Sequence, residues 1–247
     1  MPEGPSIIIL KELILPFKGK KILSATGNAK IDMSRLRNKK VVDIRSWGKQ
    51  LFFVMNGFNV RVHFLLFGTY SINEQVKPDK SLRLCMKFSN GTLYLYTCSV
   101  RIPEEELDSL YDWTADVMSE AWDPAKAKRK LKENPQMMVC DALLDQQIFS
   151  GVGNIIKNEV LYRIRLHPET RIKNIPLRKL TELITEARNY SFDFLKWKKE
   201  FVLKKHWLAH TKKICKRCDL PLIKKYCGKT NRRTFYCDNC QVKYKKY

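Results

Sequence analysis

Four cysteines near the end of the chain form two pairs, Cys215-x-x-Cys218 and Cys237-x-x-Cys240, with eighteen residues between the pairs. Two thiolate pairs at this spacing close a tetrahedral metal site, and a segment this short needs such a cross-link because it cannot bury a core of its own. All four ligands come from the protein, so we expect one structural Zn²⁺ with no open coordination position; iron is the less favoured alternative.

The charge of the chain indicates a polyanionic partner. The formal net charge is +22, and residues 196–247 alone hold 17 Lys and Arg against three acidic residues. Such a field repels itself unless a polyanion neutralises it, and nucleic acid is the usual one. A merely soluble Lys-rich surface explains scattered charge better than charge this concentrated. No apolar run approaches eighteen residues, so neither a membrane span nor a membrane partner is expected.

The start of the chain, Met1-Pro2-Glu3-Gly4-Pro5, lacks the basic region of a secretory signal, and the apolar run that follows it is short. We therefore expect a cytoplasmic, nucleoid-associated protein. In that compartment paired cysteines are read as metal ligands and not as disulfides. The four scattered cysteines are then expected to be reduced.

The chain changes texture along its length. Short β-branched or aromatic runs occur at 40–45, 50–55, 59–64 and 82–88, a helix is expected near 5–16, and Asn56-Gly57 and Asn90-Gly91 are typical of hairpin turns. Helix formers with 3.6-residue spacing dominate 104–205, as at Leu143, Leu144, Ile148, Leu180, Leu183, Ile184 and Ala187. These patterns predict an α+β multidomain chain: a β-sandwich or open barrel with one helix (1–115), a helical domain (116–210) and the zinc finger (211–247).

Pro2 follows the initiator methionine, which is normally removed before a small second residue. The mature chain would then begin with a secondary amine, whose pKa near ~8 leaves an appreciable neutral, nucleophilic fraction at physiological pH. Attack on a sugar C1′ would give an iminium, and the adjacent Glu3 is placed to act as a general acid. A proline at position 2 is weak evidence by itself.

The segment Gly151-Val152-Gly153-Asn154 precedes a helical stretch from Ile156 to Tyr162. Two glycines permit a tight turn that delivers backbone N–H groups and Asn154 to a helix N-terminus, an anion site suited to a DNA phosphate. A plain helical hairpin is an equally good interpretation of this segment alone.

Five segments together resemble the formamidopyrimidine-DNA glycosylase/endonuclease VIII family, in order and across the whole chain: Pro2-Glu3-Gly4-Pro5, Leu143-Leu144-Asp145-Gln146, Gly151-Val152-Gly153-Asn154-Ile155, Leu166-His167-Pro168 and Arg232-Arg233-Thr234-Phe235-Tyr236-Cys237. The resemblance implies an N-terminal β-sandwich, a helix–two-turn–helix domain and a C-terminal zinc-finger β-hairpin, with DNA between the lobes. It also implies a monomeric, bifunctional DNA glycosylase/AP lyase of base excision repair, acting on damaged double-stranded DNA through a Schiff base and then β,δ-elimination.

The resemblance further implies roles for single residues. Pro2 is similar to the Schiff-base nucleophile and Glu3 to its acid/base partner. Lys49 matches a lysine that holds a phosphate and assists proton transfer, although it could be an ordinary hairpin lysine. Asn154 matches a phosphate-binding asparagine. Arg232 matches the zinc-finger arginine that clamps phosphates, with the register open by one residue to Arg233.

The family everts its target base and fills the vacated space with side chains. The segment His63-Phe64-Leu65-Leu66-Phe67-Gly68 resembles the loop that carries one such wedge and places Leu66 there, unless Leu66 belongs to the core. The second wedge loop falls at 98–102 and departs from the family pattern; Arg101 survives in it and is expected to contact phosphate.

Three features favour oxidised pyrimidines over oxidised purines as substrates. The segment before Cys215 is short and Lys-rich, without the Gly-rich loop of the 8-oxoguanine branch; Cys140 stands where that branch carries a lysine; and the purine-branch wedge is altered. An 8-oxoguanine/formamidopyrimidine enzyme is the alternative within the same class. A non-catalytic zinc-ribbon protein that binds damaged DNA is the competing class, but it has no use for Pro2, Glu3 and Lys49 together.

Overall fold

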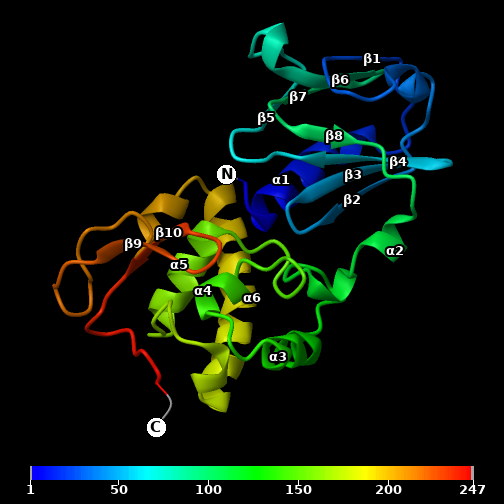
Figure 1. The fold of residues 1–247 in the computed structure, drawn as a ribbon. Helices are drawn as coiled ribbons and strands as arrows, with labels where there is room; N and C mark the ends of the chain where they lie inside the picture. Colours follow the sequence, from blue (N-terminus) through cyan, green and yellow to red (C-terminus); the bar gives the residue numbers. More distant parts are fainter. Residues whose placement is uncertain (1, 246–247) are drawn as a thin grey trace. The chain divides into compact units, whose positions relative to one another are not determined.

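The structure is a computed structural model that describes residues 2–245. The chain divides into two compact units, Met1–Asp112 and Trp113–Tyr247 (Figure 1). The zinc-finger segment belongs to the same unit as the helices. Among residues 2–245, no helix combines the length and the apolar character that crossing a bilayer requires.

The first unit is a β-sandwich of two antiparallel four-stranded sheets, with strand orders β2-β3-β4-β8 and β1-β6-β7-β5 (Figure 1). Helix α1 packs against β2 and β3. The elements are α1 (Gly4–Ile14), β1 (Ser24–Thr26), β2 (Asp43–Trp47), β3 (Gln50–Met55), β4 (Phe58–His63), β5 (Thr69–Ile72), β6 (Leu82–Phe88), β7 (Gly91–Tyr96), β8 (Ser99–Arg101) and α2 (Leu107–Leu110).

The sandwich has one apolar core, to which α1 contributes Ile7, Leu10 and Ile14. In β6 the residues at even numbers from Leu82 to Phe88 are buried while those between them are more exposed, which is the period-2 pattern of a strand with one covered face. The expected strands and hairpin turns lie at or within a few residues of their predicted positions. The expected helix over 5–16 ends at Ile14 and continues as a 3₁₀ turn.

The second unit combines helices with the C-terminal hairpin. Its elements are α3 (Pro124–Glu133), α4 (Val139–Ala142), α5 (Asn154–Arg163), α6 (Leu177–Lys199), β9 (Ile223–Cys227) and β10 (Arg232–Tyr236). Helix α6 buries one stripe that includes the four positions expected from the spacing, Leu180, Leu183, Ile184 and Ala187. Leu143, Leu144 and Ile148, in contrast, lie in turns between α4 and α5. Leu143 and Ile148 are buried although they lie in turns, so apolar residues at this spacing need not belong to one helix.

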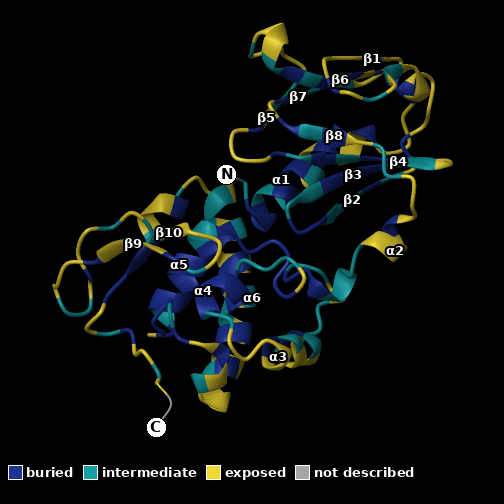
Figure 2. Cartoon of the chain, in the orientation of Figure 1, coloured by how far each residue is buried: buried dark blue, intermediate teal, exposed yellow. Residues whose placement is uncertain are grey.

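Helix α5 is buried on every side from Ile156 to Tyr162, and Figure 2 shows it as the dark centre of its unit. Its middle carries three consecutive polar residues, Lys157, Asn158 and Glu159, each with no exposed surface. A buried polar group destabilises the fold unless it is hydrogen-bonded, so the partners of these side chains decide what surrounds α5.

Candidate active site and nucleic-acid interface

The chain start is fixed by helix α1. Glu3 is the N-cap of α1 with extended backbone, and its carbonyl oxygen accepts a hydrogen bond from the Ser6 N–H at 2.8 Å. Pro5 lies in the first turn, where its missing N–H has no helical partner to lose. Glu3 is 1% exposed and Pro2 is half-buried. The terminal residues are therefore fixed at the first turn of α1.

Lys49 lies in the tight turn between β2 and β3, the two strands on which α1 packs. Gly48 has a φ of +54°, and the Trp47 indole N–H anchors the turn by donating to the Asp112 carbonyl oxygen at 2.9 Å. Lys49 is half-buried. Burial first, and then the charges of Arg61 and Lys49, lower the pKa of His63. This end of the sheet is thus electropositive.

The loop between β4 and β5 presents three consecutive apolar side chains to solvent: Leu65, Leu66 and Phe67 are 49%, 47% and 77% exposed. Leu66 is therefore not a core residue. The Gly68 N–H donates to the Phe64 carbonyl oxygen at 2.8 Å, and a Cβ on Gly68 would lie 2.3 Å from that same oxygen. Local backbone contacts keep these three apolar side chains exposed to solvent. Contiguous exposed apolar side chains of this kind are typical of an interaction surface.

Arg101 is exposed at the end of β8 and lies directly opposite Arg61 of β4. Directly opposed residues of an antiparallel pair lie on the same face, where two like charges repel. The Arg61 Nε is buried and has no hydrogen-bond acceptor among the described residues. Sequence reasoning singled out Arg101 and missed Arg61. An anion at this edge would neutralise both side chains.

The two turns before α5 are held together by Gln146. Its amide nitrogen donates to the carbonyl oxygens of Leu144 and Val152, and its amide oxygen accepts from the Gly151 N–H. Gly151 has a φ of +97°. This clamp fixes the entry into α5 at Asn154.

Asn154 connects α5 with the hairpin. Its Nδ2 donates to the Arg233 carbonyl oxygen at 2.9 Å, while its buried Oδ1 receives no hydrogen bond from the described residues. A buried acceptor without a donor is unusual and needs an explanation such as a ligand or a water. The side chain lies at the positive end of the helix dipole.

The four cysteines predicted as metal ligands converge: their Sγ atoms all lie within 4.8 Å of one another. The Cys215–Cys240 and Cys218–Cys237 Sγ pairs are 3.7 and 3.4 Å apart. Four thiolates around one tetrahedral ion with bonds of about 2.3 Å would be separated by about 3.8 Å, so the donor set fits a metal ion of that kind.

Arg232 and Arg233 open strand β10 and are both exposed. Because successive side chains of a strand point to opposite faces, the two arginines belong to different faces of the hairpin. Arg232 shares its face with Thr234, and Arg233 shares its face with Phe235. Two guanidinium groups thus flank the hairpin tip, and Arg232 remains the predicted phosphate ligand.

The buried polar residues of α5 hold the segments around the hairpin. Lys157 Nζ donates to the Thr234 hydroxyl at 2.8 Å. Glu159 accepts the backbone N–H groups of residues 208–210, which follow α6. Asn158 Nδ2 lies 2.9 Å from Nδ1 of His210. Burial first, and then the charges of Lys157 and Arg233, lower the pKa of His210 to about 4.

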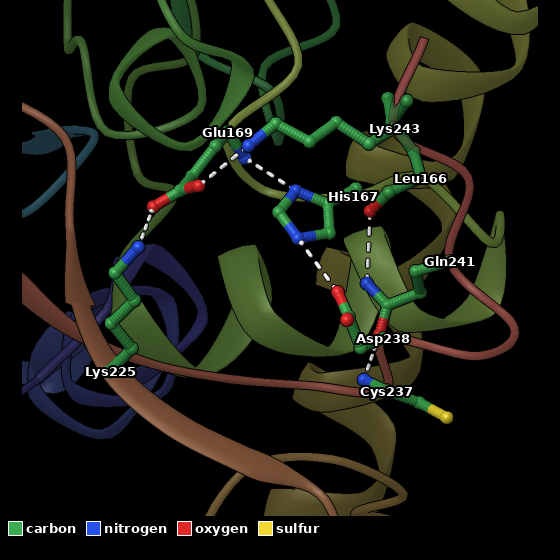
Figure 3. A network of polar contacts seen from close by, with 8 residues as sticks. All are labelled: Leu166, His167, Glu169, Lys225, Cys237, Asp238, Gln241 and Lys243. Carbon is green, nitrogen blue, oxygen red and sulfur yellow. Dashed lines mark hydrogen bonds and ion pairs between the residues drawn. The ribbon is translucent and has the colours of Figure 1, made fainter.

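Charged groups hold the hairpin below its tip, at the middle of β9 and at the segment after the last cysteine, as Figure 3 shows. Glu169 accepts ion pairs from Lys225 of β9 and from Lys243 beyond the last cysteine. These hydrogen bonds lower the pKa of the Glu169 carboxyl to about 2. His167 Nε2 lies 3.4 Å from an Asp238 oxygen.

Gln241 completes the attachment of the base. Its Nε2 donates to the Leu166 carbonyl oxygen at 2.9 Å, and its Oε1 accepts from the Cys237 N–H at 2.8 Å (Figure 3). The predicted motif Leu166-His167-Pro168 therefore docks the metal-binding loop onto the helices. Nothing in the sequence near Gln241 or Glu169 signals this function.

The chain is similar in sequence and fold to known proteins. The formamidopyrimidine-DNA glycosylase N-terminal domain matches residues 1–101, and the H2TH domain of the same glycosylase matches residues 102–191. Endonuclease 8-like 3 of Xenopus laevis is 29% identical over 231 residues, which cover 89% of this chain but 38% of that protein. The chain thus spans well under half the length of this curated relative.

Two solved structures show the same fold. A viral DNA glycosylase superposes with a TM-score of 0.84 at 22% identity, covering 97% of this chain and 100% of that one. The Lactococcus lactis formamidopyrimidine-DNA glycosylase, bound non-covalently to DNA with an AP site, superposes with a TM-score of 0.83 at 22% identity, covering 97% and 99%. From the two domain matches and the ordered motifs, the chain belongs to the formamidopyrimidine-DNA glycosylase/endonuclease VIII family.

Proposed function

We propose that this chain is a bifunctional DNA glycosylase/AP lyase that removes oxidised bases from duplex DNA. The observation that carries the proposal is the chain start: Pro2 and the buried Glu3 are held at the first turn of α1, on the strands β2 and β3 that meet at the Lys49 turn. A non-catalytic zinc-ribbon protein has no need to fix an amine, an acid and a lysine in this way.

The chemistry begins once Met1 has been removed. The neutral Pro2 amine attacks C1′ of the damaged nucleotide; the new N–C1′ bond forms as the bond from C1′ to the base breaks, and the base leaves with the electron pair and a proton. Glu3 supplies a proton to the sugar ring oxygen, which opens the ring to an iminium. Lys49 holds the neighbouring phosphate.

The iminium then acts as an electron sink. Loss of a C2′ proton breaks the C3′–O bond (β-elimination), and a second elimination breaks the C5′–O bond (δ-elimination). Hydrolysis of the remaining iminium by water returns the free amine. No external oxidant or reductant is needed.

The proposed DNA contacts come from several described groups. Arg101, with Arg61 opposite, would hold phosphate at the β8 edge, and Asn154 and Arg232 would do so at α5 and the hairpin. Leu66 and its apolar neighbours would fill the space left by the everted base. The four cysteines would hold a structural Zn²⁺ that keeps the hairpin folded. We propose that the protein acts as a monomer. Its basic surface would keep it associated with the nucleoid DNA of the cytoplasm.

We further propose oxidised pyrimidines as the preferred substrates. Cys140 is 1% exposed within the core, so the position at which the 8-oxoguanine branch carries a lysine offers no charge here. The similarity to endonuclease 8-like 3 over 89% of the chain supports the same branch. Excision of 8-oxoguanine or formamidopyrimidine is the alternative, and duplexes carrying thymine glycol, 5,6-dihydrouracil, 8-oxoguanine or an abasic site distinguish the two.

Borohydride trapping tests the reaction. Hydride adds to the iminium carbon and leaves a stable protein–DNA adduct, which mass spectrometry should place on Pro2. Pro2→Gly should lower the trapped yield at least about tenfold, because the secondary amine is lost. Active enzyme that retains Met1, or full trapping by a protein with a blocked amino terminus, would overturn the proposal.

Salt dependence tests the phosphate ligands. Lys49→Ala and Arg232→Ala should each weaken duplex binding and reduce the slope of log K against log salt by about 1. Lys18→Ala, which removes a half-exposed lysine paired with Asp43, is the matched control and should leave the slope nearly unchanged. Slopes equal to wild type for Lys49→Ala and Arg232→Ala would remove these assignments.

A further inference from the structure

The turn between β9 and β10 closes around a carboxylate from another element. Asp141 of α4 accepts the Thr230 N–H at 3.0 Å and the Thr230 hydroxyl at 2.8 Å on Oδ1, and the Lys229 N–H at 2.9 Å on Oδ2. Asp141 is 8% exposed, so these bonds replace most of its water. Successive backbone N–H groups in a turn form a concave anion site, and here the protein fills that site itself.

The backbone of the turn is shaped to fit this carboxylate. Gly228 has a φ of +71° and Asn231 a φ of +46°, both in the left-handed region. A Cβ on Gly228 would lie 2.3 Å from Asp141 Oδ1, so only glycine admits the carboxylate at this distance. The turn therefore has a conformation that depends on α4.

The tip of the hairpin lies far from the metal ligands along the chain. Arg232, which follows the turn, is five residues from Cys237, or about 17 Å of extended strand. The cysteine cage can fix the base of the hairpin, but a two-stranded ribbon by itself is only marginally stable. Toward the tip, Asp141 contacts the turn and Asn154 contacts the Arg233 carbonyl oxygen, while Lys157 contacts Thr234 in the middle of β10.

We propose that Asp141 is a positioning residue for DNA binding: its carboxylate locks the turn at residues 228–231 and thereby aims Arg232 at a DNA phosphate. The inference rests on the proposed function in its use of Arg232. The sign of the effect is informative. An acidic side chain close to a phosphate contact would normally repel DNA, so its removal should strengthen binding, whereas removal of a positioning carboxylate should weaken it.

The test is a double-mutant cycle read by equilibrium binding to a duplex with a tetrahydrofuran abasic analogue, which needs no catalysis. Asp141→Asn keeps the shape of the side chain but removes its charge, and we expect about tenfold weaker binding with a salt slope lower by about 1. In the Arg232→Ala background the same change should have less than about a twofold effect, because the aimed group is gone. Metal stoichiometry should stay at one per chain.

Asp193→Asn is the matched control, since it removes an exposed acidic charge from α6 of the same unit. It should leave binding unchanged or strengthen it slightly. Thr230→Val removes only the hydroxyl donor to Asp141 and should give a smaller loss in the same direction, which keeps the proposal testable if Asp141→Asn does not fold.

Two results would overturn the proposal: unchanged or tighter binding by Asp141→Asn, or an equal loss in the wild-type and Arg232→Ala backgrounds. Failure of the proposed function would look different. If the wild-type protein bound the analogue but was never trapped by borohydride, the lyase proposal would be wrong. The double-mutant cycle of binding affinities could still be measured.

Discussion

Two loops that we propose to contact DNA are held in opposite ways. The loop 64–68 is fixed by its own backbone, because Gly68 donates to Phe64 and leaves no room for a Cβ. The hairpin turn 228–231 is fixed by Asp141, a residue 87 positions before Gly228 in the sequence. An apolar wedge needs only to stay out of the core, so local rigidity suffices. A charged phosphate ligand needs a defined direction, and a distant partner supplies it.

Metal removal should have the largest effect, because it should impair the hairpin and leave the apolar loop 64–68 intact. Cys215→Ser, or chelation, should unfold the base of the hairpin and lower affinity for duplex DNA at least about a hundredfold, because structural metal binding provides folding energy. Hydrogen exchange should show lost protection over residues 207–245, while strands β2 to β4 of the first unit stay protected.

Cys227→Ser is the control for that experiment. Cys227 is also a cysteine of the hairpin and is buried, but its sulfur is not among the four that converge. Elemental analysis should find one metal per chain in Cys227→Ser and less than one in Cys215→Ser. Equal metal loss in both variants would contradict the four-ligand site.

Substitution of Gly228 in the hairpin turn and of Gly68 in the apolar loop should separate the functions of the two loops. Gly228→Ala introduces a Cβ at positive φ against Asp141, at a cost of about 1–3 kcal/mol, and should weaken duplex binding about tenfold. Gly68→Ala should distort only the apolar loop, so it should lower base excision about tenfold and leave affinity for undamaged duplex unchanged.

Gly57→Ala separates these effects from backbone strain alone. Gly57 has a φ of +83° but nothing within 4 Å of an added Cβ. It should cost about 1 kcal/mol of stability and change neither binding nor excision. If Gly228→Ala and Gly68→Ala both impaired duplex binding, or both impaired only base excision, the proposal that the two loops serve different steps would be wrong.

The same division explains what the sequence could predict. The cysteine spacing, the strand alternation and the chain-start motif are local signals, so the metal cluster, the sandwich and the family are accessible from them. The hydrogen-bond partners of Asp141, Lys157 and Glu159 lie tens of residues away in the sequence. The residues next to a buried charged side chain in the sequence do not indicate that it is buried. Three consecutive polar residues such as Lys157-Asn158-Glu159 carry no apolar periodicity that predicts burial, and only the packing of the hairpin and of residues 208–210 around α5 shows that they are buried. The prediction of helix at Leu143 and Ile148 is wrong for a related reason: both residues are buried, but in turns.

Leu66→Ala tests the wedge with a smaller expected effect. Leu66 is 47% exposed, so its truncation should change the free energy of unfolding by less than about 0.5 kcal/mol. Excision from duplex DNA should fall about fivefold and excision from single-stranded DNA much less, since a single strand leaves no stacked space to fill. Val76→Ala, at another exposed apolar position of the same unit, should affect neither. Equal losses on both substrates would contradict a wedge.

The last prediction concerns the ion pairs of Glu169 with the hairpin and their dependence on pH. Because the pKa of Glu169 is lowered from 4.5 to about 2, its ion pairs stabilise the folded state above pH 4.5, and this contribution is lost as the pH falls from 4.5 through 2. Lys225 and Lys243 are about half-exposed, so solvent screening limits the effect of Glu169→Gln at pH 7 to about 1 kcal/mol. Denaturant unfolding should show wild type and variant converging between pH 4.5 and 2, while exposed Glu120→Gln matches wild type throughout. A difference that persisted at pH 2 would mean that Glu169 holds the hairpin by its packing and not by its charge.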